Sequence, residues 1–454
     1  MAFRSIDPTT GEVWRTWETA SPDDVERTLA RAAAARTSWT ATPIAERAAH
    51  LRAVATRLRA GAADFAVLMA REMGKPVTEG EAEVEKCAAT CDFYAEHAAA
   101  MLAPEPRDVP KQRAYVRFDP LGTVFAIMPW NFPFWQVLRC AIPTLIAGNT
   151  LLLKHAGNVP GCAEALATLF AEAGVPAGVF ENLHLPHDAV DAVIADPRVA
   201  AVTLTGSTAA GRAVAAAAGR ALKKTVLELG GSDAFVVLAD ADVDAAAADA
   251  ADARLVNGGQ SCIASKRFIV DARVADAFVE RFARAMALRR VGNPLERTTQ
   301  VGPLARRDLR DELHRQVEAT RAQGARLVVG GTVPDGPGAF YPPTVLDGVL
   351  PGMTAFDEET FGPVAAVTRA RDEADVIRLA NASVYGLAGA VWSRDHARAE
   401  RVAAAMETGS VAVNGHVRSD PRMPFGGVKE SGYGRELSEW GLREFVNVKA
   451  VVVH

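Results

Sequence analysis

One cysteine of the chain follows a glycine-rich turn, a setting that suits a nucleophile. The segment 257–262 reads Asn-Gly-Gly-Gln-Ser-Cys and ends at Cys262. Glycines let the backbone approach a ligand closely and aim its amide groups. If a helix begins after the turn, its dipole would favour the thiolate of Cys262. The alternative is a buried cysteine that packs as a small apolar side chain, as most cysteines do.

Two further side chains could assist such a nucleophile. Glu228 lies between two leucines and just before two glycines, so partial desolvation should raise its pKa and suit it to general-base catalysis. The alternative is an ion-paired glutamate at a domain junction. Asn131 lies in the segment Pro-Trp-Asn-Phe-Pro, where a rigid amide could donate to an oxyanion. Its alternative is an Asx turn between a strand and a helix.

A third segment has the composition of a phosphate-binding turn. Residues 205–211 read Thr-Gly-Ser-Thr-Ala-Ala-Gly, and amides at a helix start can bind phosphate. The glycine spacing is not that of the common dinucleotide fingerprint. It matches a nucleoside-triphosphate loop, but Arg212 and Ala213 stand where lysine and a hydroxyl residue would hold phosphate and magnesium. A kinase or ATPase function is therefore excluded.

These segments lie at the ends of predicted strands that alternate with helices. Strands are predicted over 122–128, 150–153, 199–204, 225–229, 234–238, 266–270 and 410–414, and helices over 21–60, 62–100, 134–147, 160–173 and 206–221. Such alternation predicts an α/β fold with parallel sheets and ligands at the carboxyl ends of the strands. Segment 111–118 is predicted to be an exposed strand or arm, and the valine-rich tail 445–453 an edge strand that needs a partner.

Composition narrows the classes further. The 454 residues predict two or three domains, and 49% hydrophobic with 23% charged residues indicate a globular protein. A net charge of −5 without a basic block argues against nucleic-acid binding. The apolar stretch 123–153 is interrupted by polar residues and prolines, so no membrane helix is expected. The first residues lack the apolar core of a signal peptide, which predicts a cytoplasmic protein.

The other four cysteines favour no disulfide framework and no metal site. Five cysteines are an odd number for paired bridges. Cys87 and Cys91 lie four residues apart in a helical stretch, with His97 nearby, and two small side chains on one helix face are favoured over a metal pair. Cys140 and Cys162 lie in apolar segments and are predicted to be core thiols.

In their order and spacing the motifs resemble the aldehyde dehydrogenase superfamily, through nearly the whole chain. Cys262 lies 34 residues after Glu228, which is the family's spacing. The resemblance also includes Lys154 and the segments 129–131, 205–207, 228–231, 259–262, 358–364 and 424–432. It implies an NAD(P)-binding domain of Rossmann type, an α/β catalytic domain and a small β oligomerisation arm. The implied ranges are 1–101 with 121–231, then 232–435, then 102–120 with 436–454.

The resemblance also implies roles and partners. Cys262 matches the nucleophile, Glu228 the general base and Asn131 the oxyanion donor of an enzyme that oxidises aldehydes through a thioester. The implied oligomer is a homodimer or homotetramer. The residues that match cofactor contacts are Trp130, Lys154 at the adenosine ribose, Gly157, Gly206, Ser207 at the pyrophosphate, Leu229, Glu359 at the nicotinamide ribose and Phe361 against the nicotinamide ring.

Within the superfamily the chain looks closest to bacterial succinate-semialdehyde dehydrogenases. The segments 134–139, 153–156, 263–268 and 431–436 carry that likeness. It implies that Arg139 binds the distal carboxylate of the substrate, the alternative being a structural arginine paired at a domain boundary. Val256 replaces a second arginine of some relatives, and Arg254 or Arg418 could substitute for it.

The likeness bears on cofactor choice and redox behaviour as well. NAD-preferring relatives often carry a glutamate three residues after the lysine, where this chain has Gly157. Glycine would leave room for the 2′-phosphate beside Lys154, and His155 could add a donor, so NADP is favoured, with NAD also usable. Ala264 stands where some relatives have a second cysteine, which predicts no disulfide within the active site.

Two other functions stay open at this point. One is a non-catalytic scaffold of the same fold, against which the joint presence of Cys262, Glu228 and Asn131 argues. The other is a CoA-acylating enzyme, in which CoA rather than water takes the acyl group. A water-activating base is unwanted in that reaction, so Glu228 favours hydrolysis.

Overall fold

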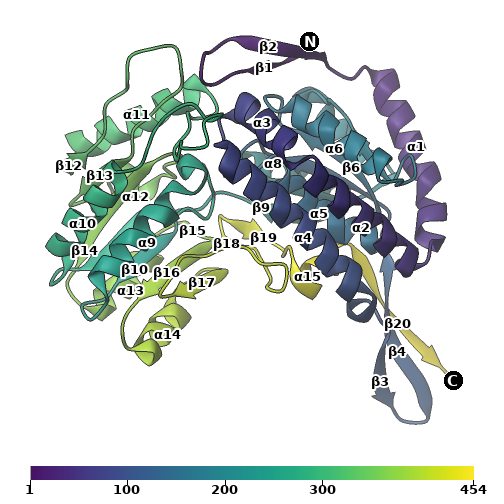
Figure 1. The fold of residues 1–454 in the computed structure, drawn as a ribbon. Helices are drawn as coiled ribbons and strands as arrows, with labels where there is room; N and C mark the ends of the chain where they lie inside the picture. Colours follow the sequence, from purple (N-terminus) through teal and green to yellow (C-terminus); the bar gives the residue numbers. More distant parts are fainter. Residues whose placement is uncertain (1) are drawn as a thin grey trace.

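Two stacks of mainly parallel strands lie side by side, and a narrow three-stranded sheet extends from one of them (Figure 1). The computed structural model describes residues 2–454. The predicted α/β class is confirmed. Within the described residues, no helix is both long enough and apolar enough to span a bilayer.

The first lobe contains a six-stranded sheet in the order β19-β9-β8-β5-β6-β7. All neighbours in it run parallel except β19, which pairs antiparallel with β9. Helices cover both faces, so every residue of β6 is buried and the strand reads as an almost unbroken apolar run. The strands are β5 (Thr123–Met128), β6 (Thr150–His155), β7 (Phe180–Asn182), β8 (Val199–Thr205), β9 (Lys224–Glu228) and β19 (Gly432–Tyr433).

The helices of this lobe begin where the sequence supplies caps. Ser21 and Asp24 form a capping box at the start of α1, and Ser207 accepts from the Ala210 amide at the start of α8. The helices are α1 (Pro22–Ala41), α2 (Ile44–Ala60), α3 (Ala62–Met73), α4 (Val77–Met101), α5 (Trp135–Ile146), α6 (Pro160–Glu172), η1 (His187–Ala189), α7 (Val190–Ala195) and α8 (Thr208–Arg220).

The second lobe contains a seven-stranded sheet in the order β12-β13-β14-β11-β10-β16-β17, in which only β12 runs antiparallel to its neighbour. Its strands are β10 (Ala234–Val237), β11 (Arg267–Asp271), β12 (Arg326–Val329), β13 (Thr344–Asp347), β14 (Val364–Ala370), β16 (Ala388–Trp392) and β17 (Ser410–Val413). Its helices are α9 (Val243–Leu255), η2 (Val256–Gly259), α10 (Ala275–Ala287), α11 (Arg307–Ala322), α12 (Thr354–Asp357), α13 (Glu373–Asn381) and α14 (His396–Ala405).

Short strands tie the two lobes together. β15 (Tyr385–Gly386) pairs with β18 (Val428–Lys429), and the chain then returns to the first lobe as β19. Across the opposite side lies the hairpin of β1 (Ala2–Ile6) and β2 (Val13–Glu18), drawn at the top of Figure 1. Its turn reaches the second lobe, where the Ala339 amide donates to the Pro8 carbonyl at 2.8 Å.

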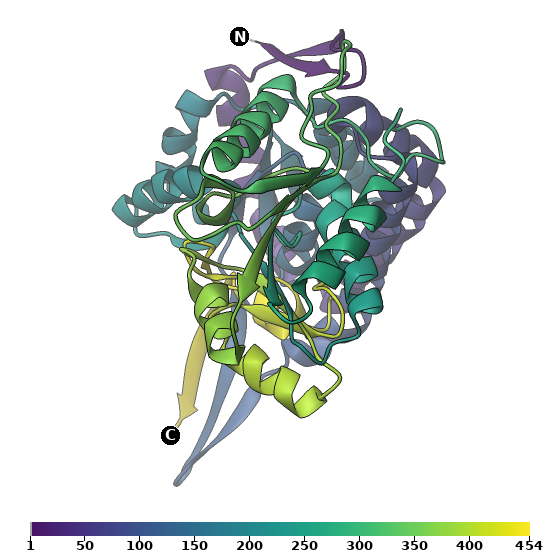
Figure 2. The ribbon, with the colours of Figure 1, turned by 90° about the vertical axis from the view of Figure 1, so that its left-hand side faces the viewer.

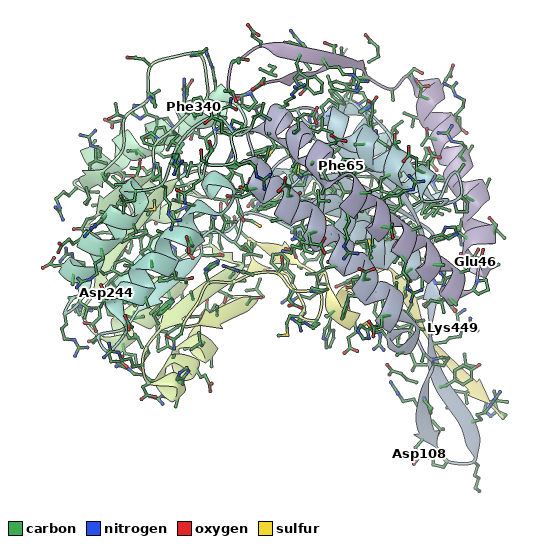
Figure 3. The ribbon with its side chains drawn as sticks, in the orientation of Figure 1. Glu46, Phe65, Asp108, Asp244, Phe340 and Lys449 are labelled. Carbon is green, nitrogen blue, oxygen red and sulfur yellow. The ribbon has the colours of Figure 1, made fainter. Side chains whose placement is uncertain are left out.

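The extended sheet is built from β3 (Glu105–Val109), β4 (Gln112–Pro120) and the C-terminal β20 (Val446–Val453), in the order β20-β4-β3. It projects beyond the body with the C-terminus at its end (Figure 2). The labelled Asp108 and Lys449 lie on it in Figure 3. The tail is therefore an edge strand, as predicted, and its partner within the chain is β4.

Residues 436–445 do not join this sheet, although the sequence groups them with the arm. They form α15 (Ser438–Leu442), and Leu437 and Leu442 are buried in the core of the first lobe. The arm sheet itself is thus limited to 105–120 and 446–453. The division of the chain into three domains stays a prediction.

The four cysteines outside the glycine-rich turn are buried and unbridged, so the predicted core thiols Cys140 and Cys162 are confirmed. Cys87 and Cys91 are buried within α4. In the part of the chain that the structure describes, no three metal-ligating side chains gather at one point.

A buried ion pair fixes the start of α5, the helix that carries Arg139. The ammonium of Lys75 contacts the carboxylate of Glu83, and both side chains are almost fully buried. Glu83 Oε1 also accepts from the Phe134 and Trp135 amides at 2.9 and 2.8 Å. Two amides of a helix start that would otherwise lack partners are thereby satisfied.

We expect Glu83→Gln to destabilise the fold by about 3–5 kcal/mol, since it leaves the Lys75 charge buried without a counter-ion. Urea unfolding followed by circular dichroism measures the loss. Glu85→Gln is the matched control, because Glu85 belongs to an exposed ion pair with Arg59 and should change stability by less than about 1 kcal/mol. Equal midpoints for the two variants would contradict the role of the buried pair.

Candidate active site

The candidate nucleophile lies at the end of a sharply turned loop between the two lobes. Asn257, Gly258 and Gly259 all have left-handed backbone angles, with φ of 55°, 62° and 79°. A Cβ on Gly259 would lie 2.3 Å from the Gly362 carbonyl oxygen, so only glycine fits at that position. The loop then passes through Cys262 in a turn and enters β11. No helix begins at Cys262, so the condition for stabilisation of its thiolate by a helix dipole is not met, and the strand predicted over 266–270 follows instead.

A buried lysine, not a helix, organises this loop. Lys266 Nζ donates to the carbonyls of Ser261, Cys262 and Ala264 at 3.0, 3.0 and 3.1 Å. It also lies 3.5 Å from the Glu359 carboxylate. Sequence reasoning assigned Lys266 no role. The available signal was a charged residue at the entry to an apolar strand, four residues after the cysteine.

The surroundings of Cys262 keep its thiol protonated. Burial raises the pKa of Cys262 to about 12, and the charges of Glu228 and Glu359 add to that rise. Arg139 and Lys266 act in the opposite direction, but more weakly than burial. The resting side chain is therefore a thiol at neutral pH, and a nearby base or cation must assist its ionisation.

Glu228 is the last residue of β9 and is almost fully buried. Desolvation raises the pKa of Glu228 well above its usual range, Glu436 raises it further, and Arg139 lowers it. The predicted rise is confirmed. Among the described residues neither carboxylate oxygen has a hydrogen-bond partner, so the alternative of an ion-paired junction residue finds no counterpart. A base in this condition can accept a proton from an incoming water.

Asn131 lies against the same loop. The side-chain Nδ2 of Asn131 donates to the Gln260 backbone carbonyl at 3.0 Å, and the backbone carbonyl of Asn131 accepts from Asn257 Nδ2 at 2.7 Å. One of the two amide N–H bonds is thus used to hold the side chain beside the loop. The second N–H is left for an oxyanion.

Lys154 is the second-last residue of β6 and so lies near the carboxyl end of that strand. Its side chain is almost fully buried, and within residues 2–454 it has neither an ion-pair nor a hydrogen-bond partner. Burial lowers the pKa of Lys154 to about 8. Its charge is also the main cause that lowers the pKa of His187, a residue that sequence reasoning missed. A cation kept without a counter-ion at a strand end suits a phosphate or ribose ligand.

The remaining candidate cofactor residues flank the start of α8 and the strand ends. Gly206 precedes the N-cap Ser207, whose hydroxyl is engaged with Ala210, so backbone amides are the donors available to a phosphate there. Leu229 packs closely against Gly211. The Trp130 and Phe361 rings meet edge to face with centroids 5.7 Å apart. Glu359 Oε1 accepts from the Gly231 amide at 3.0 Å.

The surroundings of Gly157 and His155 bear on the expected 2′-phosphate region. A Cβ on Gly157 would lie 2.9 Å from the Phe3 ring, so this ring occupies the place that a side chain at position 157 would take. His155 Nε2 lies 2.9 Å from the Pro133 carbonyl, and Nδ1, which accepts from the Ala156 amide at 2.9 Å, lies 3.3 Å from the Met128 carbonyl. Burial lowers the pKa of His155 to about 4. A neutral ring already engaged on both sides supplies no donor to a cofactor.

A cavity of about 590 Å³ opens on the substrate side of Cys262. Arg139 lines it, contacts the Glu436 carboxylate, and lies over the Phe425 ring at 4.6 Å. This pairing is the one that a structural arginine would make. Its Nη2 is buried and nevertheless lacks a hydrogen-bond partner in the described chain.

Arg254 and Arg418, the two arginines that could substitute for the arginine missing at Val256, lie at different positions relative to the cavity. Arg254 is fully buried, does not line the cavity, and donates to the Gly259 carbonyl at 2.7 Å. Arg418 lines the cavity, is exposed, and donates to His416 Nε2 at 3.0 Å. Of the two, only Arg418 lies on the cavity wall, at its exposed rim.

Comparison with known proteins identifies the family of the chain. The model of the aldehyde dehydrogenase family matches residues 1–451. The chain belongs to the aldehyde dehydrogenase family. The resemblance seen in the motifs is thereby confirmed.

Several relatives of this aldehyde dehydrogenase are similar along their whole lengths. It is 52% identical over 447 residues to the succinate semialdehyde dehydrogenase [NAD(P)+] Sad of Escherichia coli K12, with 98% of this chain and 97% of that protein covered. It is 48% identical over 454 residues to the succinate-semialdehyde dehydrogenase [NADP(+)] 1 of Mycobacterium tuberculosis H37Rv, with 99% of each covered. The solved Streptococcus pyogenes succinic semialdehyde dehydrogenase in complex with NADP+ superposes with a TM-score of 0.97, at 39% identity and 99% coverage of both chains.

The raised pKa of Cys262 gives a direct test of the resting site. We expect the alkylation rate of Cys262 by iodoacetamide, without cofactor, to keep rising with pH beyond 9, since the thiolate forms only as pH approaches the raised pKa. Peptide mass spectrometry identifies the modified cysteine, and glutathione is the control whose rate levels off near its ordinary pKa. A plateau for Cys262 below pH 8 would show that the thiol is already activated.

Proposed function

We propose that this aldehyde dehydrogenase oxidises succinate semialdehyde to succinate, with NADP+ as the preferred electron acceptor and NAD+ also usable. The observation that carries the proposal is the cavity beside Cys262, whose wall contains the cations Arg139 and Lys86. An aldehyde with a distal carboxylate suits such a wall, because its aldehyde carbon can meet the thiol while its anion meets the cations. The names of the relatives support the same substrate and cofactor.

The catalytic step follows from the loop geometry. The Cys262 thiolate adds to the aldehyde carbon, and the oxyanion accepts from the free Asn131 amide N–H and from the Cys262 backbone N–H. A nicotinamide dinucleotide, which residues such as Lys154, Ser207 and Glu359 would hold, would supply the hydride acceptor that this oxidation needs. A thioester is left on Cys262. Glu228 then takes a proton from a water molecule, whose oxygen attacks the thioester carbon and releases the acid.

The residues on the other side of the loop fit the dinucleotide. Lys154 has no counter-ion and would meet the adenosine ribose and its 2′-phosphate, and the amides at the start of α8, next to Gly206 and Ser207, would bind the pyrophosphate. Glu359 and Phe361 would face the nicotinamide ribose and ring. No carboxylate stands at Gly157 to repel a 2′-phosphate. Phe3, which fills the space there, would have to move before a glutamate could be introduced.

Buried Glu228 is expected to favour hydrolysis of the thioester over transfer of the acyl group to CoA. We expect Cys262→Ala to abolish aldehyde oxidation while cofactor binding persists, and Glu228→Gln to slow deacylation at least 100-fold so that a thioester accumulates. Intact-mass spectrometry after mixing with aldehyde and NADP+ detects the adduct. In the wild type, deacylation should rise with pH as the carboxyl with its raised pKa ionises. Turnover by Cys262→Ala, or an unchanged deacylation rate in Glu228→Gln, would contradict these roles.

The substrate and cofactor are tested together by steady-state kinetics. We expect kcat/KM for succinate semialdehyde to exceed that for butanal by about 10- to 150-fold, the equivalent of one charged hydrogen bond of roughly 1.5–3 kcal/mol. NADP+ should be used with higher kcat/KM than NAD+, and added CoA should not raise the rate. Equal kcat/KM values for succinate semialdehyde and butanal would rule out the proposed substrate. A tenfold preference for NAD+ over NADP+ would rule out the proposed cofactor preference. Absence of any turnover would favour the scaffold.

We also propose that two or four copies associate through the arm. β20 is an edge strand, and Val448 is 61% exposed on it; an uncovered apolar edge invites pairing with another chain. The double substitution of Val448 and Val452 by aspartate should reduce the mass in solution, measured by light scattering. Leu288→Asp, at an exposed position of the second lobe, is the control and should leave the mass unchanged. A monomeric wild type would refute the proposal.

A further inference from the structure

The cations that line the substrate cavity are not equivalent, because most of them already have a carboxylate partner. Arg289 lies 2.6 Å from the Asp252 carboxylate, and Arg297 holds both oxygens of Glu81 at 2.7 and 2.9 Å. Arg139 contacts Glu436. The charge of each of these arginines is balanced before a substrate arrives.

Lys86 differs from these arginines. It lies on α4 and is half-buried, with its ammonium 4.1 Å from the centre of the Trp135 ring and 2.5 Å from Ser419 Oγ. Among residues 2–454 no carboxylate lies within ion-pair distance of it. The hydrogen bond to Ser419 uses one of its three N–H bonds, so two are available.

The acids nearest to Lys86 are committed elsewhere. Glu83 and Asp420 both act on its charge. However, Glu83 contacts Lys75, and Asp420 lies 2.6 Å from the Arg422 guanidinium. Burial, with a smaller contribution from Arg139, lowers the pKa of Lys86 to about 8. The ammonium is thus a desolvated cation whose charge an incoming anion would stabilise.

The position of Lys86 places it beside Arg139. Trp135 and Arg139 are one helical turn apart on α5, and Lys86 packs over the Trp135 ring. Lys86, Arg139 and Glu436 together carry one net positive charge. This one positive charge would be neutralised by the single negative charge of one substrate carboxylate.

We propose that Lys86 binds the distal carboxylate of the substrate and supplies the uncompensated charge, while Arg139, balanced by Glu436, contributes a directional hydrogen bond. Lys86 is then a specificity-determining residue, in place of the arginine that Val256 replaces. The inference rests on the proposed function, since it names the group that recognises that substrate. Arg418, the other lining cation without a carboxylate partner, is exposed, so water screens its charge.

The experiment compares Lys86→Gln, Lys86→Arg and Arg418→Gln with the wild type. The quantity measured is the ratio of kcat/KM for succinate semialdehyde to kcat/KM for butanal, with NADP+. Lys86→Gln should lower this ratio at least tenfold, mainly through KM for succinate semialdehyde, and Lys86→Arg should restore it to within about threefold of the wild type. Arg418→Gln removes the same charge from the exposed rim and should change the ratio by less than threefold.

A binding measurement keeps the test independent of catalysis. Calorimetric titration with succinate should show at least tenfold weaker binding to Lys86→Gln than to the wild type, and circular dichroism reports whether the variant is folded. An unchanged ratio and unchanged succinate affinity in folded Lys86→Gln would overturn the inference, as would an equal loss in Arg418→Gln. If the wild type does not prefer succinate semialdehyde to butanal, the proposed function itself is overturned. The kcat/KM ratio of the wild type shows this before any variant is made, so the two failures can be told apart.

Discussion

The ammonium of Lys266 is the contact on which the active-site loop depends. Three carbonyls of the loop converge on it, and Glu359 lies on its other side. A loop with left-handed residues at Asn257 and Gly259 cannot satisfy its own carbonyls as a helix does. Lys266 does so from the entry to β11, and it thereby joins the nucleophile to the sheet of the second lobe. The same contact holds Glu359, so the cofactor side and the cysteine are positioned by one cation.

A second cluster of charge lies under the substrate side. Burial raises the pKa of both Glu228 and Glu436. The charge of Glu436 adds to the rise at Glu228, and that of Glu444 adds to the rise at Glu436, whereas Arg139 lowers both pKa values. The pKa of Glu228, the proposed general base, is thus set by burial and a neighbouring carboxylate on one side and by one arginine on the other. Arg139 would therefore tune Glu228 apart from any contact it makes with the proposed substrate.

The sequence was sufficient for the elements and for the local setting of each candidate residue. Alternating apolar runs located β5, β6, β8 and β9 within one or two residues, and two leucines around Glu228 indicated its desolvation. What could not be predicted depends on contacts between distant segments. Phe3 against Gly157 and Glu436 against Arg139 join residues far apart in the chain. The strand predicted over 266–270 is present as β11, whereas the consecutive left-handed residues that turn the loop before Cys262 could not be predicted from the sequence alone.

The two sides of the site share one electrostatic feature, a desolvated lysine without a counter-ion. Lys154 occupies the cofactor side and Lys86 the substrate side, and burial lowers the pKa of each to about 8. A buried, unpaired charge destabilises an empty protein. An anion that binds there removes this cost and so stabilises the folded chain, by an amount that grows with the logarithm of the anion's concentration once that exceeds its Kd. The buried pair of Lys75 and Glu83 shows that the same fold can neutralise a lysine with a carboxylate of its own. Lys86 and Lys154 have no such partner among the described residues, and this difference is what suits both positions to the anions proposed for them.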